Sequence, residues 1–145
     1  EDATQYVELS IKVLGKVTGE IIVLIPWGKG LKLIDSFEKR PLGTTQTFSE
    51  KAQIILKTIC NILAGAYLNA ITQLLKLSAK PSIPELKFER REKILEMKNA
   101  AVRETEYVFA IHTAIKIEGT EIEFEVLLVP DIESLKNILY GLDAM

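Results

Sequence analysis

The first third of the chain predicts two strands and a short helix. From Tyr6 to Val13 apolar and polar side chains alternate, which is the two-residue period of a strand with one buried face. Glu20–Trp27 is a nearly continuous apolar run after the turn residues Gly15-Lys16, as expected of a strand buried on both faces. Pro26 ends this run, and the pattern predicts a helix over Leu31–Phe37.

A long helix is predicted after the loop 39–44. Thr47 and Glu50 have the spacing of a capping box, in which the hydroxyl accepts from the backbone and the carboxylate reaches back. The helix should run from there to about Ser78, roughly 40 Å at 1.5 Å per residue. Pro81 and Pro84 prevent its continuation, because proline lacks the backbone N–H and clashes with the preceding turn.

The last third predicts a strand, a helix, a hairpin and a final helix. In chain order we expect a short strand over 84–89, a charged amphipathic helix Arg90–Val102, strands Tyr107–Ile117 and Glu121–Val129 around Glu118-Gly119, and a helix Ile132–Leu142 capped by Asp131.

Two segments of the chain match at an offset of 104 residues. Leu24-Ile25-Pro26 corresponds to Leu128-Val129-Pro130, and Leu31-Lys32 to Leu135-Lys136. Each copy has a predicted hairpin, a proline and a predicted short helix, so the pattern predicts an internal duplication. Only five residues precede Tyr6, so we expect that half of one repeat lies outside this chain.

Composition narrows the classes of function. The 145 residues, 48% hydrophobic and 26% charged, are typical of one soluble globular domain. A net charge of −2 with both signs interspersed gives no basic footprint for nucleic acid. Cys60 and His112 are the single residues of their types, so a disulfide framework and a His/Cys metal cluster are excluded. We interpret His112 as a core or strand-face residue. The lone cysteine fits a reducing compartment.

The eighteen residues Thr58–Leu75 carry no charge, and three interpretations compete for them. The run is long enough to cross a membrane, but Asn61, Asn69 and Gln73 would be unpaired in hydrocarbon, so we expect no insertion. A core helix packed on the sheet is the simplest interpretation, with the residues Ile55, Leu56, Ile59, Leu63, Tyr67, Ala70 and Leu74.

The core interpretation leaves the polar residues of this helix unexplained. At 100° per residue they fall within roughly 80° of one another and form a narrow stripe of Thr58, Asn61, Gly65, Asn69 and Thr72. Glycine is about 1 kcal/mol less favourable than alanine in a helix, and it allows another backbone to approach closely. The stripe is therefore either a partner-facing surface or an ordinary solvent-facing one.

The segment Asn61–Ala70 resembles the signature helix of the CheC family of chemotaxis phosphatases, which includes CheX and the FliY-type switch proteins. In that family an Asp or Ser, a Glu and an Asn follow one another at fixed spacing, and twenty-two residues separate the Asn from a following Pro. Asn61 and Pro84 have this separation. The segments Gly43-Thr44-Thr45, Val17–Glu20 and Leu128–Asp131 also resemble CheC, and the likeness extends from about residue 6 to residue 142.

The resemblance implies an α+β fold with a mainly antiparallel sheet, long helices packed on it and a pseudo-two-fold internal repeat, in a single domain over residues 1–145 that lacks its N-terminal signature helix. It also implies a cytoplasmic protein that hydrolyses the aspartyl phosphate of a CheY-type response regulator and can bind a CheD-like protein. Asn61 would position the attacking water, and Thr58, Gly65, Asn69 and Pro84 would contact the partner. The chain would need no cofactor, because Mg²⁺ belongs to the regulator.

The chain departs from the family pattern at two positions. Thr58 stands where the family has the docking Glu, and Ile54 where it has Asp or Ser. Glu50 cannot substitute, since it lies roughly 16 Å along the helix from Asn61. This copy of the site is therefore expected to be weak or inactive, and by the repeat offset the other copy would lie about 43 residues before Glu1. A non-catalytic module that binds a regulator, a CheD-like protein or a switch component is the alternative, and an unrelated α+β ligand-binding domain is a third.

Overall fold

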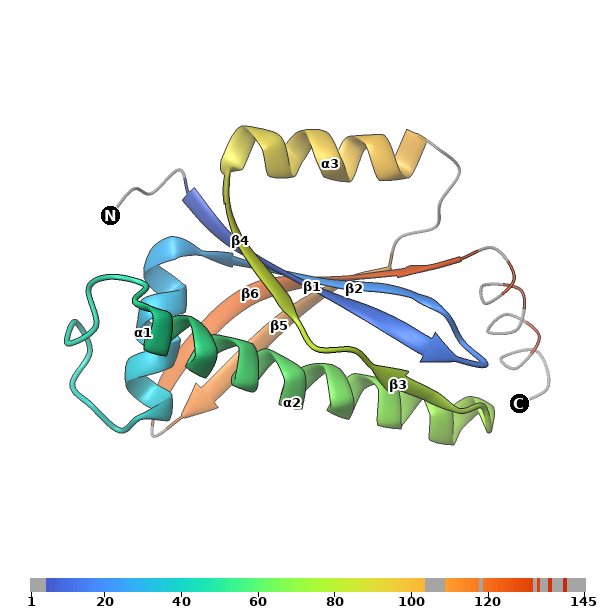
Figure 1. The fold of residues 1–145 in the computed structure, drawn as a ribbon, viewed down its shortest axis with the longest axis horizontal. Coiled ribbons are helices and arrows are strands. Elements are labelled where there is room, and N and C mark those ends of the chain that lie inside the picture. The colour runs from blue at the N-terminus through green and yellow to red at the C-terminus, as the bar shows by residue number, and fades with distance from the viewer. Residues whose placement is uncertain are drawn as a thin grey trace.

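The computed structural model describes residues 5–103, 109–117 and 119–131, together with Glu133, Lys136 and Tyr140. In chain order the elements within this part are β1 Gln5–Gly15, β2 Gly19–Pro26, α1 Trp27–Phe37, α2 Glu50–Leu75, β3 Ala79–Pro81, β4 Glu85–Arg90, α3 Arg91–Arg103, β5 Phe109–Ile117 and β6 Thr120–Pro130. Figure 1 shows α2 on one side of the sheet and α3 on the other.

The strands form one sheet in the order β3-β1-β2-β6-β5, and β4 also pairs with β1, next to β3. Every pairing is antiparallel. The predicted α+β fold with an antiparallel sheet is therefore confirmed. The short strand β3 was not predicted, because a three-residue segment is too short to show a period.

The two faces of the sheet are covered differently. The main core lies between the sheet and α2, where Leu9, Ile21 and Val126 from three strands pack with Leu56 and its helical neighbours. A smaller cluster on the other face includes Ile94 from α3. One long helix and one sheet face thus make most of the interior.

The helix α1 begins four residues earlier than the sequence predicts. Trp27, expected at the end of the second strand, is its first residue, and Pro26 occupies the position before it. Pro26 can sit there because the first turn of a helix needs no donor from it. The glycines of this segment concealed the helical pattern, but Gly30 has a packing reason, since a Cβ there would lie 3.0 Å from the Phe48 ring.

The predicted capping box of α2 is wrong. Ser49 is the N-cap residue, and its hydroxyl accepts from the backbone N–H of Ala52 at 3.1 Å. The helix ends at Leu75, three residues short of the predicted Ser78, because Lys76 takes a left-handed conformation with φ of 56°. The predicted and observed positions of both helix ends differ by only a few residues, because the sequence contains more than one residue that can end the helix on each side.

Asp35 organises the loop between α1 and α2. Its fully buried carboxylate accepts from the backbone N–H of Gly43 at 3.0 Å, from that of Thr45 at 3.0 Å and from the Thr45 hydroxyl at 2.5 Å. The Arg40 guanidinium lies 3.8 Å from the same carboxylate. The segment Gly43-Thr44-Thr45 is therefore held in place by a charge buried in α1.

Two distant segments that resemble CheC meet in the structure. Gly19 pairs with Pro130, and the Thr18 hydroxyl donates to the carboxylate of Asp131. Gly19 has φ of 151°, and a Cβ there would lie 2.4 Å from the backbone oxygen of Val129. Only glycine allows this close approach. The two segments therefore contact each other where the β1–β2 hairpin pairs with the β5–β6 hairpin.

The repeat at an offset of 104 residues does not place equivalent residues on equivalent faces. Leu24 belongs to the smaller cluster beneath α3, whereas Leu128 packs against the main core beneath α2. A two-fold axis that relates two neighbouring antiparallel strands is perpendicular to the sheet, so residues related by it must lie on the same face of the sheet. The internal duplication is thus not supported at this offset and stays a prediction about element order.

The remaining elements agree with the sequence predictions where the structure describes them. The strand predicted over 84–89 is β4, and the helix predicted over Arg90–Val102 is α3. Residues 107 and 108 of the predicted strand and most of the predicted helix Ile132–Leu142 lie outside the described residues. His112 is a strand-face residue, with a side chain 71% exposed and 3.5 Å from the Glu123 carboxylate.

Candidate functional site

The helix α2 has one buried side and one exposed side. Leu56, Cys60, Ala64 and Leu68 follow one another at helical spacing and are all buried against the sheet. Burial raises the pKa of the Cys60 thiol to about 12, so this side chain stays a neutral part of the core. The buried side anchors the helix, and the opposite side is presented outward.

Asn61 lies on the exposed side of α2. Its side chain is exposed and has no hydrogen-bond partner within the described part of the chain. An amide offers both an acceptor and two donors, and here all of them can meet a partner or water. The exposed amide is compatible with the role that the family resemblance implies for Asn61.

Thr58, one turn before Asn61, is exposed but already bonded. Its hydroxyl donates to the backbone oxygen of Ile54 at 2.9 Å. The nearest basic side chains along the helix are Lys57, which is half-buried, and Lys51, which is exposed. No carboxylate stands at the docking position of the family motif, so this part of the site differs chemically from the pattern.

Gly65 and Asn69 continue the stripe. Asn69 is exposed, and its backbone oxygen accepts from the Thr72 hydroxyl at 3.2 Å. A Cβ at Gly65 would meet nothing within 4 Å. No described residue of this chain therefore requires glycine at position 65. Close approach of a partner would be a reason for glycine there.

Replacing Gly65 by alanine should stabilise the protein by about 1 kcal/mol, because the helix gains propensity and no clash arises. Urea unfolding of the wild-type and Gly65→Ala chains measures the change, and Ala66→Gly at the next exposed position should lower stability by a similar amount. A destabilised Gly65→Ala chain would show that the glycine is needed inside this fold.

Pro84 does not lie on the exposed face. It is buried just before β4, whereas its neighbour Ile83 is 84% exposed. A buried proline can hold the chain that follows α2 in position, but it offers little surface to a partner. The predicted partner-binding role of Pro84 has no support from its burial.

By length and composition α2 is the one helix of the described residues that could cross a membrane, and only 28% of its most apolar window is buried. Its buried side supplies the main core, and these contacts would be lost in a bilayer.

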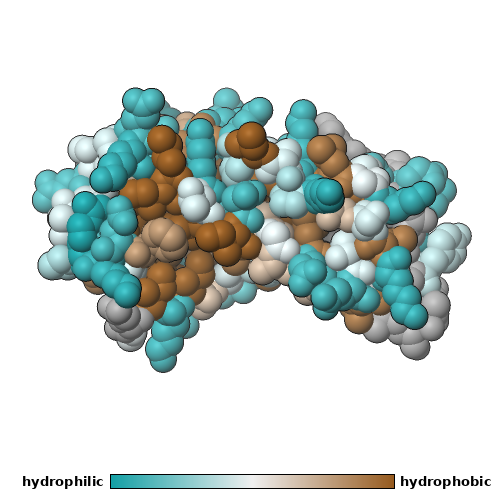
Figure 2. Space-filling view, turned by 60° about the horizontal axis from the view of Figure 1, so that its bottom comes forward, coloured by the Kyte–Doolittle hydropathy of each residue, from teal (hydrophilic) through white to brown (hydrophobic). Residues whose placement is uncertain are grey.

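Figure 2 turns the α2 side forward and shows apolar side chains gathered toward the end that holds α1 and the first turns of α2. We therefore interpret α2 as a surface helix with an apolar exposed side.

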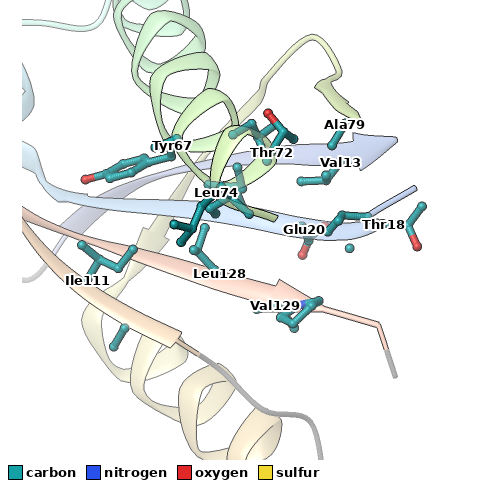
Figure 3. Close-up of a pocket in the computed structure, with 18 residues that line it drawn as sticks. Val13, Thr18, Glu20, Tyr67, Thr72, Leu74, Ala79, Ile111, Leu128 and Val129 are labelled. Atoms are coloured by element: carbon teal, nitrogen blue, oxygen red, sulfur yellow. The ribbon is translucent and has the colours of Figure 1, made fainter. Parts of the chain in front are cut away.

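A second feature is an apolar groove of about 610 Å³ under the last turns of α2. Tyr67 and Leu74 border it from the helix, and Ile111 and Leu128 from the sheet (Figure 3). The Tyr67 hydroxyl lies 2.5 Å from that of Thr113. Ala70 and Leu74, predicted in the core, are exposed here and line this groove.

The sequence analysis missed this groove and the role of Asp35. The carboxylate followed by Gly-Thr-Thr could have indicated a buried loop anchor, but the groove depends on how far α2 stands from β5 and β6. Among the described residues no group of three His, Cys, Asp or Glu side chains could hold a metal ion.

Comparison with known proteins finds similarity in sequence and in fold. No protein-family model matches the chain. It is 24% identical over 143 residues to the CheY-P phosphatase CheC of Bacillus subtilis, an alignment that covers 92% of this chain and 66% of CheC. The chain thus spans about two thirds of the length of that relative.

The fold is similar to that of FliY from Thermotoga maritima, with a TM-score of 0.71, 14% identity, and coverage of 97% of this chain and 71% of FliY. It is also similar to a chain in the CheX–CheY–BeF3–Mg complex from Borrelia burgdorferi, with a TM-score of 0.54, 16% identity, and coverage of 86% and 75%. The fold likeness and the CheC alignment agree with the resemblance first seen in the residues around Asn61.

Proposed function

This chain is a relative of the CheC, CheX and FliY proteins, and we propose from that premise that it acts on the aspartyl phosphate of a CheY-type response regulator. The observation that supports this proposal is the exposed amide of Asn61, which lies on the long helix α2 and has no partner within the described residues. A cytoplasmic location and binding of a CheD-like protein belong to the same proposal.

In the proposed mechanism the amide of Asn61 enters the regulator's site and orients the water that attacks phosphorus. Phosphoryl transfer depends mainly on positioning and on stabilisation of charge, and an amide can hold a water through one donor and one acceptor. The long helix supports this role, because its buried side fixes the backbone against the sheet. The metal that neutralises the phosphate would belong to the regulator.

We expect this copy of the site to be slow. Thr58 cannot supply the charge-assisted contact that a glutamate would make, and its hydroxyl is bonded to Ile54. The same observation favours a second candidate function, a non-catalytic module that binds a regulator without hydrolysis. The two candidate functions predict different rates of phosphate release. A phosphatase releases phosphate faster than the regulator does alone, and a binding module does not.

The test is release of phosphate from the CheY-type regulators of the source organism, each phosphorylated with acetyl phosphate. Replacing Asn61 by alanine should remove any acceleration that the wild-type chain gives, because the water loses its only proposed orienting group. Gln73→Ala removes another exposed amide of α2 and should have no effect. A fast wild-type chain that is unchanged by Asn61→Ala would contradict the proposal.

A further inference from the structure

The exposed side of α2 carries two large aliphatic side chains beside Asn61. Ile54 is 57% exposed and Ile62 is 61% exposed. They are eight residues apart, about 12 Å along the helix, and Thr58 and Asn61 lie between them. All four side chains are on the outward-facing arc, so the amide sits within an apolar surface.

Charge is absent from this surface and present at its ends. No charged residue occurs from Thr58 to Leu75, while Glu50, Lys51, Lys57 and Lys76 lie beyond the ends of the run, three of these four being basic. Single exposed aliphatic residues are common, but an outward-facing helical arc usually carries charged side chains. Here the helix with membrane-like composition is only 28% buried in its most apolar window. Such a surface favours an apolar contact with positive charge around it.

We infer that the partner regulator docks by apolar contact with Ile54 and Ile62 on either side of Asn61, and that its contact surface is apolar with an acidic rim facing Lys51 and Lys57. This inference rests on the proposed function. Apolar contact replaces the ion pair that Thr58 cannot make. An acidic rim is complementary to the two lysines.

Binding of the CheY-type regulators of the source organism, charged with beryllofluoride and Mg²⁺, tests the inference by calorimetry. Ile54→Ser and Ile62→Ser should each weaken the complex about tenfold, because each removes apolar surface buried on docking. Leu95→Ser on α3 is the matched control, since Leu95 is 48% exposed on the other side of the sheet. Raising NaCl from about 50 to about 500 mM should weaken the complex by about threefold, because salt screens the contacts of Lys51 and Lys57 with the acidic rim.

The outcomes separate this inference from the proposed function. If the wild-type chain binds and Ile54→Ser and Ile62→Ser keep its affinity, the docking mode is wrong while the role of Asn61 can stand. If no regulator binds, both fail. If Ile62→Ser instead lowers self-association in sedimentation, or abolishes binding to phosphatidylglycerol vesicles, the surface serves a second copy or a membrane and the inference is overturned.

Discussion

Replacing Thr58 by glutamate should raise the rate at which this chain dephosphorylates a CheY-type regulator by about tenfold. One charge-assisted contact between the new carboxylate and a cationic group of the partner is worth about 1.5 kcal/mol, which corresponds to a factor of about ten. The new side chain should be free to reach the partner. Its neighbours one turn away on either side are Ile54, Ile55, Asn61 and Ile62, and none of them is charged.

Phosphate release under single-turnover conditions measures this gain. Thr58→Gln has the same length without the charge and should give no gain, and Ala66→Glu adds a carboxylate elsewhere on the exposed side and should give none either. Adding Asn61→Ala to Thr58→Glu should remove the acceleration. If Thr58→Gln matches Thr58→Glu, the improvement does not come from an ion pair, and the docking role assigned to position 58 is wrong.

Replacing Asp35 by alanine should lower the free energy of unfolding by about 3 kcal/mol. The carboxylate is fully buried and accepts three hydrogen bonds from Gly43 and Thr45, so its loss leaves these donors without a partner. The Arg40 guanidinium would also lose its nearby charge. The effect is large because one side chain holds the whole loop that leads into α2.

Urea unfolding followed by the fluorescence of Trp27 measures this loss. Trp27 is the single tryptophan of the chain, and its ring centre lies 4.8 Å from that of Phe48, just before α2. Thr44→Ala is the control, because the Thr44 hydroxyl donates only to Pro41 within the exposed loop, and it should change stability by less than about 0.5 kcal/mol. An Asp35→Ala chain as stable as the Thr44→Ala chain would show that the loop does not depend on the carboxylate.

Sequence patterns predicted the long helices and strands but not the residues at which they begin and end. The alternation in β1 and the apolar period of α2 extend over many residues, and both elements lie where they were predicted. The cap of α2 was misplaced, because Thr47 and Ser49 are both good capping residues and the sequence does not say which one meets a free N–H. The internal repeat is not supported at its offset for a related reason, since matching residue types do not report which face of the sheet a side chain occupies.

For the candidate site, too, the sequence predicted some positions correctly and others wrongly. The helical period alone placed Asn61, Thr58 and Asn69 on one side, and that side is exposed. It also placed Ala70 and Leu74 in the core, which is wrong, because the end of α2 lies beside an open groove. Pro84 was assigned to the partner surface from its spacing to Asn61, and spacing along the chain carries no information about burial.

By itself the sequence determined the order of the longer strands and helices, the long uncharged helix and the side of that helix on which the amide stripe lies, because these follow from periods within one segment. Only the tertiary structure decided which strands pair, that Gly19 meets Pro130, that Asp35 holds the loop, and that α2 leaves a groove beneath its last turns. Each of these depends on contacts between residues far apart in the chain, and the free energy of such contacts is not encoded in any single local pattern.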